Sequence, residues 1–151
     1  MYKRVLVPLD GSERSESILP CVEQIAGPAD VEVILLTVVT LPASPSVLTS
    51  GVVFPDEVEA VQAQAEKALA IIKGKLVTKG FRARLLVTVA AASEVASEIC
   101  RVAREEHADL IAMSTHGRTG AGRLVFGSVA EGVVRAAPLP ILLIRTVAPC
   151  R

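Results

Sequence analysis

Hydrophobic residues along this chain occur in short, mostly apolar runs. Three of these runs, residues 4–9 (RVLVPL), 31–39 (VEVILLTVV) and 82–89 (RARLLVTV), are rich in valine and leucine. Two later runs, residues 109–115 (DLIAMST) and 140–144 (PILLI), have the same character. Short continuous apolar runs of this kind are typical of strands that are covered on both faces. The pattern therefore predicts five buried strands.

Segments with helical spacing of apolar residues separate these runs. The first helix is expected within residues 12–26, where Asp10 or Ser12 caps its start, and Gly27 ends it. Pro20 lies near the middle of this segment, so it kinks the helix or moves its start to a later residue. The longest helix is expected over residues 56–79. One of its faces is apolar and is formed by Val58, Val61, Ala65, Leu69, Ile72 and Leu76.

Two further helices are predicted, over residues 91–108 and 128–137. The first of these turns Val95, Ile99, Val102 and Ala103 inward. Ser128 and Glu131 have the spacing of a capping box, and Asp56 with Glu59 forms a similar pair at the start of the longest helix.

The alternation of strands and helices predicts an α/β fold. We expect one doubly wound, five-stranded parallel sheet with helices on both faces, formed by a single domain of residues 1–151. Right-handed crossovers place the carboxyl ends of the strands along one rim of such a sheet. Ligands of this fold class bind at that rim, where the strand order reverses.

Composition narrows the functional classes. The chain has 51% hydrophobic but only 3% aromatic residues, which suits aliphatic strands packed under alanine-rich helices. The formal net charge is zero, which gives no support to a nucleic-acid-binding surface. The apolar runs are shorter than the roughly 20 residues of a membrane-spanning helix, so we expect no membrane segment and a cytoplasmic location. The cysteines Cys21, Cys100 and Cys150 lack metal-binding spacing and are interpreted as reduced thiols, the first two in the core.

The richest candidate chemistry lies in residues 114–128, STHGRTGAGRLVFGS, between a predicted strand and a predicted helix. A helix start exposes unpaired N–H groups and the positive end of the helix dipole. Gly127 would let a phosphate approach these groups closely, and Gly117 permits a sharp turn after the strand. Arg118 and Arg123 would add positive charge nearby.

Other strand ends bring further candidate side chains to the same rim. Val38 and Met113 would form an apolar slot for a purine ring. Asp10 suits ribose hydroxyls or Mg²⁺, or else only caps the first helix. The pattern also fits an ordinary connection, since glycines between a strand and a helix are common turn residues. The segment is neither a Walker A loop nor the dinucleotide fingerprint, and His116 by itself fits a loop or packing residue.

Two stretches of the sequence resemble the universal stress protein family, and the resemblance extends over the whole chain. They are RVLVPLDGSERSESILPCVEQIA near the start and HADLIAMSTHGRTGAGRLVFGSVAEGVVRAAPLPILLIR near the end. The nucleotide-binding branch of the family carries Gly, two residues, Gly, nine residues, and then Gly with Ser or Thr. Here Gly117, residues 118–126 and the pair Gly127–Ser128 match this spacing. Ser114 stands where the pattern has its first glycine.

The resemblance implies an ATP-binding regulatory stress-response protein with a Rossmann-like, adenine nucleotide alpha hydrolase-like fold and strand order 3-2-1-4-5. It implies that ATP binds with Mg²⁺ and that Val38 meets the adenine through its backbone. The remaining implied positions fall into three groups. Pro8, Leu9 and Asp10 flank the adenine and ribose; Met113, Ser114, Thr115, His116, Gly117, Arg118, Thr119 and Gly120 wrap the ribose and phosphates; and Gly127, Ser128, Val129 and Ala130 hold the phosphates. The family commonly dimerises through the last strand, here Pro140–Ile144, which would otherwise be an apolar edge.

Other functions remain open from the sequence. One is a nucleotide-free dimeric stress scaffold. Another is a slow ATPase, in which His116 or Asp10 would orient water and Arg118 would stabilise charge. The sequence shows no committed general base, so we assign no catalytic residue, and no protein partner is indicated. A flavin carrier is disfavoured, because the chain has no Trp and only one Tyr.

Overall fold

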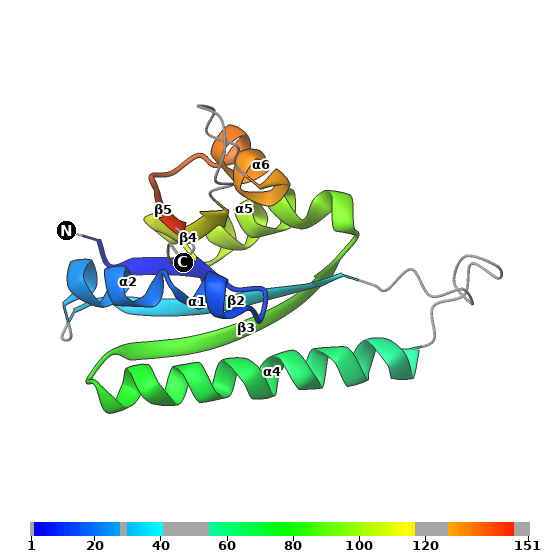
Figure 1. Cartoon of the computed structure of the whole chain (residues 1–151), viewed down its shortest axis with the longest axis horizontal. Helices are drawn as coiled ribbons and strands as arrows, with labels where there is room; N and C mark the ends of the chain where they lie inside the picture. Colours follow the sequence, from blue (N-terminus) through cyan, green and yellow to red (C-terminus); the bar gives the residue numbers. More distant parts are fainter. Residues whose placement is uncertain (1, 28–29, 41–54, 117–126, 147–151) are drawn as a thin grey trace, which may run out of the picture.

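The computed structural model describes residues 2–27, 30–40, 55–116 and 127–146. The predicted alternation of strands and helices is present in these residues (Figure 1). The strands are β1 (Arg4–Pro8), β2 (Glu32–Thr40), β3 (Arg82–Ala90), β4 (Leu110–His116) and β5 (Ile141–Thr146). The helices are α1 (Glu13–Glu16), α2 (Leu19–Ala26), α4 (Pro55–Thr78), the 3₁₀ turn η1 (Ala92–Glu94), α5 (Val95–Glu105) and α6 (Ser128–Ala136).

The five strands form one parallel sheet in the order β3-β2-β1-β4-β5, which confirms the predicted topology. The chain moves outward from β1 through β2 to β3, and then crosses back to β4 on the other side of β1. The strand order therefore reverses between β1 and β4. In doubly wound sheets, ligands bind beyond the carboxyl ends of the strands at this point.

Helices cover both faces of the sheet (Figure 1). On one face, Val5 and Val7 of β1 belong to a core shared with Val22 of α2 and with α4. On the other face, Leu6 belongs to a second core shared with α5 and α6. Neighbouring residues of one strand thus enter different cores, because side chains alternate across a sheet. Burial on both sides explains why the strands are continuous apolar runs.

The predicted first helix is interrupted near Pro20, and its start is not moved to a later residue. The segment divides into α1 and α2, with Pro20 in the first turn of α2, where a missing N–H group costs nothing. Ser12 caps α1, since its hydroxyl accepts a hydrogen bond from the Ser15 amide at 3.1 Å. Gly27 ends α2 with a φ of 60°, a value that glycine adopts readily.

Both predicted capping pairs are wrong. The N-cap of α6 is Gly127, with extended φ and ψ of −60° and 153°, so Ser128 is already inside the first turn. Glu131 pairs instead with Arg135, at 2.7 Å. Helix α4 begins at Pro55, which places Asp56 inside that helix as well. In each case a residue that favours the start of a helix, glycine at the N-cap or proline in the first turn, precedes the predicted cap.

The cysteines of the described residues lie in or against the core, as predicted. Cys100 is 2% exposed on the inner face of α5, and burial raises the pKa of its thiol. Cys21 is half-buried and packs against the core on the α2 side. Cys150 lies outside the described residues.

Candidate functional site

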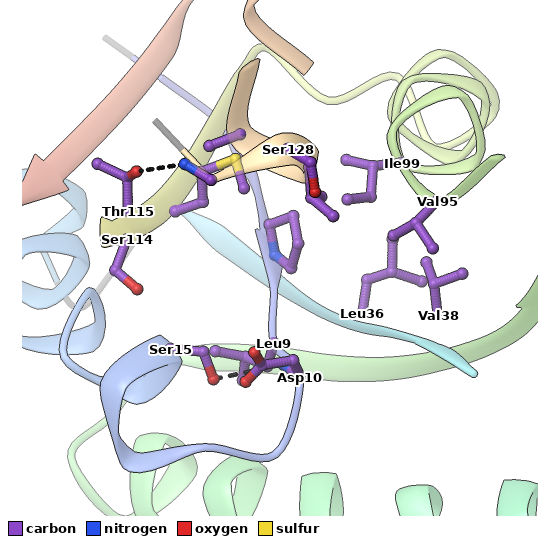
Figure 2. Close-up of a pocket in the computed structure, with 15 residues that line it drawn as sticks. Leu9, Asp10, Ser15, Leu36, Val38, Val95, Ile99, Ser114, Thr115 and Ser128 are labelled. Atoms are coloured by element: carbon purple, nitrogen blue, oxygen red, sulfur yellow. Dashed lines mark hydrogen bonds between the residues drawn. The ribbon is translucent and has the colours of Figure 1, made fainter. Parts of the chain in front are cut away.

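A cavity of about 450 Å³ lies at the rim where the strand order reverses (Figure 2). Its volume falls in the usual range of small-molecule sites, roughly 300–1,000 Å³. Its walls come from the carboxyl ends of β1, β2 and β4, the start of α6, and one side of α5. The lining residues are Pro8, Leu9, Asp10, Ser15, Leu36, Val38, Val95, Ile99, Met113, Ser114, Thr115, Gly127, Ser128, Val129 and Ala130.

One side of this cavity is an apolar slot between β2 and α5. Leu36 and Val38 lie two residues apart on β2 and therefore point to the same face of the sheet. Val95 and Ile99 lie one helical turn apart on α5 and face them (Figure 2). Met113, 6% exposed, closes the slot on the β4 side. A slot with these walls accepts a flat apolar ring better than a charged group.

The backbone of Val38 provides hydrogen-bonding groups for this slot. The Leu36 carbonyl points toward β1, because it accepts a hydrogen bond from the Leu9 amide at 2.8 Å. Every second residue of a strand points its N–H and C=O groups to the same neighbour, so those of Val38 also point toward the β1 side. The pairing of β1 with β2 ends at Pro8 and Leu36. Val38 therefore lies past the end of β1, next to the cavity.

Leu9 forms part of the cavity wall, but its backbone N–H and C=O groups are already hydrogen-bonded within the protein. Its amide is used by the Leu36 carbonyl, and its carbonyl accepts a hydrogen bond from Thr37 Oγ1 at 3.0 Å. Its side chain is 4% exposed and belongs to the core on the α2 side. These bonds fix the end of β1 against β2, and so fix the direction in which Asp10 leaves the strand.

The start of α6 faces the opposite side of the cavity. Gly127 is the N-cap and has no side chain, and its amide donates to Thr115 Oγ1 at 3.4 Å. The first-turn amides of Ser128, Val129 and Ala130 have no acceptor within a helix of this geometry. Among the described residues, a β-carbon at Gly127 would meet no atom within 4 Å. The positive end of the α6 dipole thus opens on the cavity and favours an anion there.

Asp10 supports the start of α1, which is one of the roles that the sequence left open, and it also lies at the cavity. Its Oδ1 accepts hydrogen bonds from the Ser12 amide at 2.9 Å and the Ser12 hydroxyl at 2.6 Å, so it supports the start of α1. It also lines the cavity. Burial alone raises the pKa of Asp10, but the hydrogen bonds from Ser12 and Ser15 outweigh it, and the net pKa lies below the ordinary value. The carboxylate is therefore charged at neutral pH.

Ser114 directs its hydroxyl away from α6. Along β4 successive side chains alternate, so Thr115 faces α6 while Ser114 faces α1. The Ser114 hydroxyl donates to the Arg14 carbonyl of α1 at 2.8 Å. A serine at this position leaves the start of α6 open.

The structure brings together most of the predicted site residues. Eleven of the predicted positions line the cavity: Pro8, Leu9, Asp10, Val38, Met113, Ser114, Thr115, Gly127, Ser128, Val129 and Ala130. His116 is the last residue of β4. Gly117, Arg118, Thr119 and Gly120, like Arg123, lie outside the described residues.

Four lining residues were not predicted: Ser15, Leu36, Val95 and Ile99. The periodicity did place Val95 and Ile99 on the inner face of their helix, but nothing in the sequence separates cavity walls from core. Leu36 could have been found from Val38, which lies two residues further along the same face. No sequence pattern indicates that Ser15 lines the cavity, because its position depends on how α1 folds back over β1.

Two negative findings apply to the described parts of the chain. No group of three or more His, Cys, Asp or Glu side chains there could hold a metal ion. Within the same residues, no helix has both the length and the apolar character needed to cross a membrane.

A doubly wound parallel sheet with a cavity at its switch point defines the class of Rossmann-like α/β proteins. The sequence model of the Universal stress protein family matches residues 1–145. The chain belongs to the universal stress protein family.

Individual relatives agree with this assignment. Universal stress protein MJ0577 of Methanocaldococcus jannaschii is 30% identical over 158 residues, covering 96% of this chain and 96% of the relative. A solved structure of MJ0577 matches with a TM-score of 0.79 and covers 98% of this chain and 99% of that one. A universal stress protein from Archaeoglobus fulgidus in complex with dAMP has a TM-score of 0.65 at 21% identity, covering 94% and 97% of the two chains. A universal stress protein in complex with cAMP has a TM-score of 0.60 at 21% identity, covering 97% and 98%.

Proposed function

We propose that this protein binds ATP with Mg²⁺ in the cavity at the switch point and acts as a homodimeric, cytoplasmic regulator of the stress response. The observation that carries the proposal is the order of chemistry along the cavity. The apolar slot lies at one side of the cavity. The charged carboxylate of Asp10 and the hydroxyl of Ser15 lie at the end of β1, and the start of α6 lies opposite the slot. This order matches the parts of an adenine nucleotide: base, ribose and phosphates.

The adenine would lie in the slot between Val38 and Val95. Apolar side chains there cover both faces of a ring, while the exposed backbone of Val38 offers a donor and an acceptor to the ring edge. Two proteins with this fold, the dAMP and cAMP complexes, bind ligands that contain adenine. That shared base supports an adenine nucleotide here.

The phosphates would lie at the start of α6. The amides of Ser128, Val129 and Ala130 are the donors, and the hydroxyl of Ser128 adds another. Gly117, Arg118, Thr119 and Gly120 complete the proposed set of phosphate contacts. Mg²⁺ is usually held by one or two carboxylates together with the phosphates of the ligand. Asp10 lies in the lining of the cavity, and its charged carboxylate suits this role in addition to a contact with the ribose hydroxyls.

The homodimer would form through β5. This strand is at one edge of the sheet, and its apolar residues Ile141, Leu142, Leu143 and Ile144 are only half-buried. An apolar edge strand with unpaired backbone groups favours pairing with a second strand. Pairing with the same strand of a second copy gives a closed two-fold dimer.

The direct test is to denature freshly purified protein, identify any released nucleotide by mass spectrometry, and then titrate nucleotide-free protein with Mg-ATP by calorimetry. We expect adenine nucleotide in the released fraction and a dissociation constant well below ~1 mM, a value that corresponds to only about −4 kcal/mol. If no nucleotide is released and affinity is weaker than this, the protein is instead a nucleotide-free scaffold. Phosphate release during the titration would identify a slow ATPase.

A further inference from the structure

Helix α1 is a single turn at the edge of the cavity, where Ser15 belongs to the lining (Figure 2). None of its residues is buried, so apolar packing of its own side chains does not hold it in place. A helix of this length is also unstable by itself. Its position is therefore set by the buried Leu9 and Ile18 on either side of it and by hydrogen bonds to its surroundings.

The hydrogen bond from the Ser114 hydroxyl to the Arg14 carbonyl joins α1 to β4 across 100 residues of sequence. Within α1 and its start, the Ser15 hydroxyl donates to the Ser12 carbonyl at 2.8 Å and accepts from the Asp10 amide at 3.3 Å. Ser12 in turn donates twice to the Asp10 carboxylate. The Arg14 carbonyl belongs to the peptide bond that leads to Ser15, so β4 is joined through the backbone of α1 to the hydrogen bonds at the end of β1.

We propose that Ser114 is a positioning residue, which fixes α1 so that Asp10 and Ser15 are held where they contact the ribose hydroxyls of the bound nucleotide. This inference rests on the proposed nucleotide function. Asp10 and Ser15 both line the cavity, whereas the Ser114 hydroxyl is turned toward α1 and acts through it. The glycine of the family pattern has no hydroxyl at this position, so the contact is a property of this chain.

A second contact limits how far α1 can move without Ser114. The Ser17 hydroxyl, just after α1, donates to the same Arg14 carbonyl at 2.7 Å and lies 3.3 Å from Thr146 Oγ1 at the end of β5. It joins this end of α1 to β5 but reaches no residue that lines the cavity. Loss of the Ser114 hydroxyl should therefore remove the link from α1 to β4 and leave the fold intact.

The experiment compares ATP with 2′,3′-dideoxy-ATP, both with Mg²⁺, by calorimetry. Because both ligands carry the same base and phosphates, the ratio of their dissociation constants isolates the ribose hydroxyls. We expect the wild-type protein to bind ATP about tenfold more tightly than the dideoxy analogue, as for one hydrogen bond to a charged group. In Ser114→Ala the ratio should fall to about twofold, and Ser114→Thr, which keeps a hydroxyl, should restore it.

Ser97→Ala is the matched control. The Ser97 hydroxyl also donates to a backbone carbonyl, that of Glu94 at 3.1 Å, but Ser97 is exposed and does not line the cavity. Its ratio should equal that of wild type. Hydrogen exchange without nucleotide gives a second measurement, and the amides of residues 13–17 should exchange faster in Ser114→Ala than in Ser97→Ala.

The outcomes separate the two proposals. If the wild type binds both ligands but Ser114→Ala keeps the wild-type ratio, the positioning role is wrong and the nucleotide function stands. If the wild type binds ATP and the dideoxy analogue equally well, the positioning role is wrong, because there is then no contact with the ribose hydroxyls for Ser114 to support. If the wild type binds neither ligand, the proposed function is wrong, and the role of Ser114 is wrong with it.

Discussion

Gly132 of α6 packs so closely on Ala96 of α5 that a β-carbon on Gly132 would lie 2.6 Å from the Ala96 β-carbon. This contact sets the distance between the two helices on one face of the sheet. Since the start of α6 and one side of α5 both line the cavity, the same contact helps to set the cavity's width.

Gly132→Ala should therefore destabilise the fold. Overpacking a close contact between two helices typically costs about 1–3 kcal/mol, even though alanine favours helix formation. Urea denaturation followed by circular dichroism measures the change. Gly74→Ala in α4 is the matched control: a β-carbon there would meet no atom within 4 Å, so this variant should be as stable as wild type or more so. Equal stability of the two variants would contradict the close contact.

Gly127→Val should abolish ATP binding without loss of the fold. A β-carbon at Gly127 meets no atom of the described residues within 4 Å, and its φ of −60° is open to any residue. The added side chain would instead fill the space at the start of α6 where phosphate is proposed to lie. We expect Mg-ATP affinity to fall by at least tenfold, with only a slightly lower urea midpoint, since valine is a poorer N-cap than glycine. Unchanged affinity would remove Gly127 from the site, and Gly127→Ala should give a smaller loss.

The Asp10 carboxylate should make stability depend on acidity. Its pKa in the folded protein is below the ordinary value, so its stabilising contribution is complete above the unfolded value of 3.8 and is lost as pH falls through the lower folded value. Asp10→Asn keeps an oxygen acceptor but carries no charge. The stability difference between wild type and Asp10→Asn, measured by urea denaturation, should be constant near neutral pH and shrink below about pH 4. A difference that grows on acidification would show that the pKa is raised instead.

Leu143→Pro should weaken the proposed dimer. The Pro140 carbonyl accepts from the Ile111 amide and so points toward β4. By alternation, the N–H groups of Ile141 and Leu143 point to the free edge, and proline at position 143 removes one of them.

Sedimentation of this variant should show a larger monomer fraction than wild type, while circular dichroism confirms the fold. Ile71→Lys is the control, because Ile71 is 64% exposed on α4, away from β5. A Leu143→Pro protein that remains fully dimeric would exclude pairing through this strand, and loss of the dimer in Ile71→Lys would point to α4.

The sequence predicted the described fold well, because helices cover both faces of the sheet and the strands are therefore mainly apolar. The ends of helices were predicted less well. Ser128 and Glu131 have the spacing of a capping box, but Gly127 is the N-cap and Glu131 forms an ion pair with Arg135. Spacing alone does not say which of several suitable residues begins the helix, since that depends on how the preceding segment enters it.

By itself, the sequence determined the order of strands and helices, the two-sided burial of the sheet and the glycine–serine pair at the start of α6. These follow from local periodicity and from the conformational preferences of single residues. The tertiary structure decided which residues meet at the cavity. Ser15, Val95 and Ile99 reach it only because α1 and α5 fold over the rim from opposite faces. The hydrogen bond from Ser114 to Arg14 likewise could not be predicted from the sequence. It joins residues 100 positions apart, which only the crossing from β3 to β4 brings together.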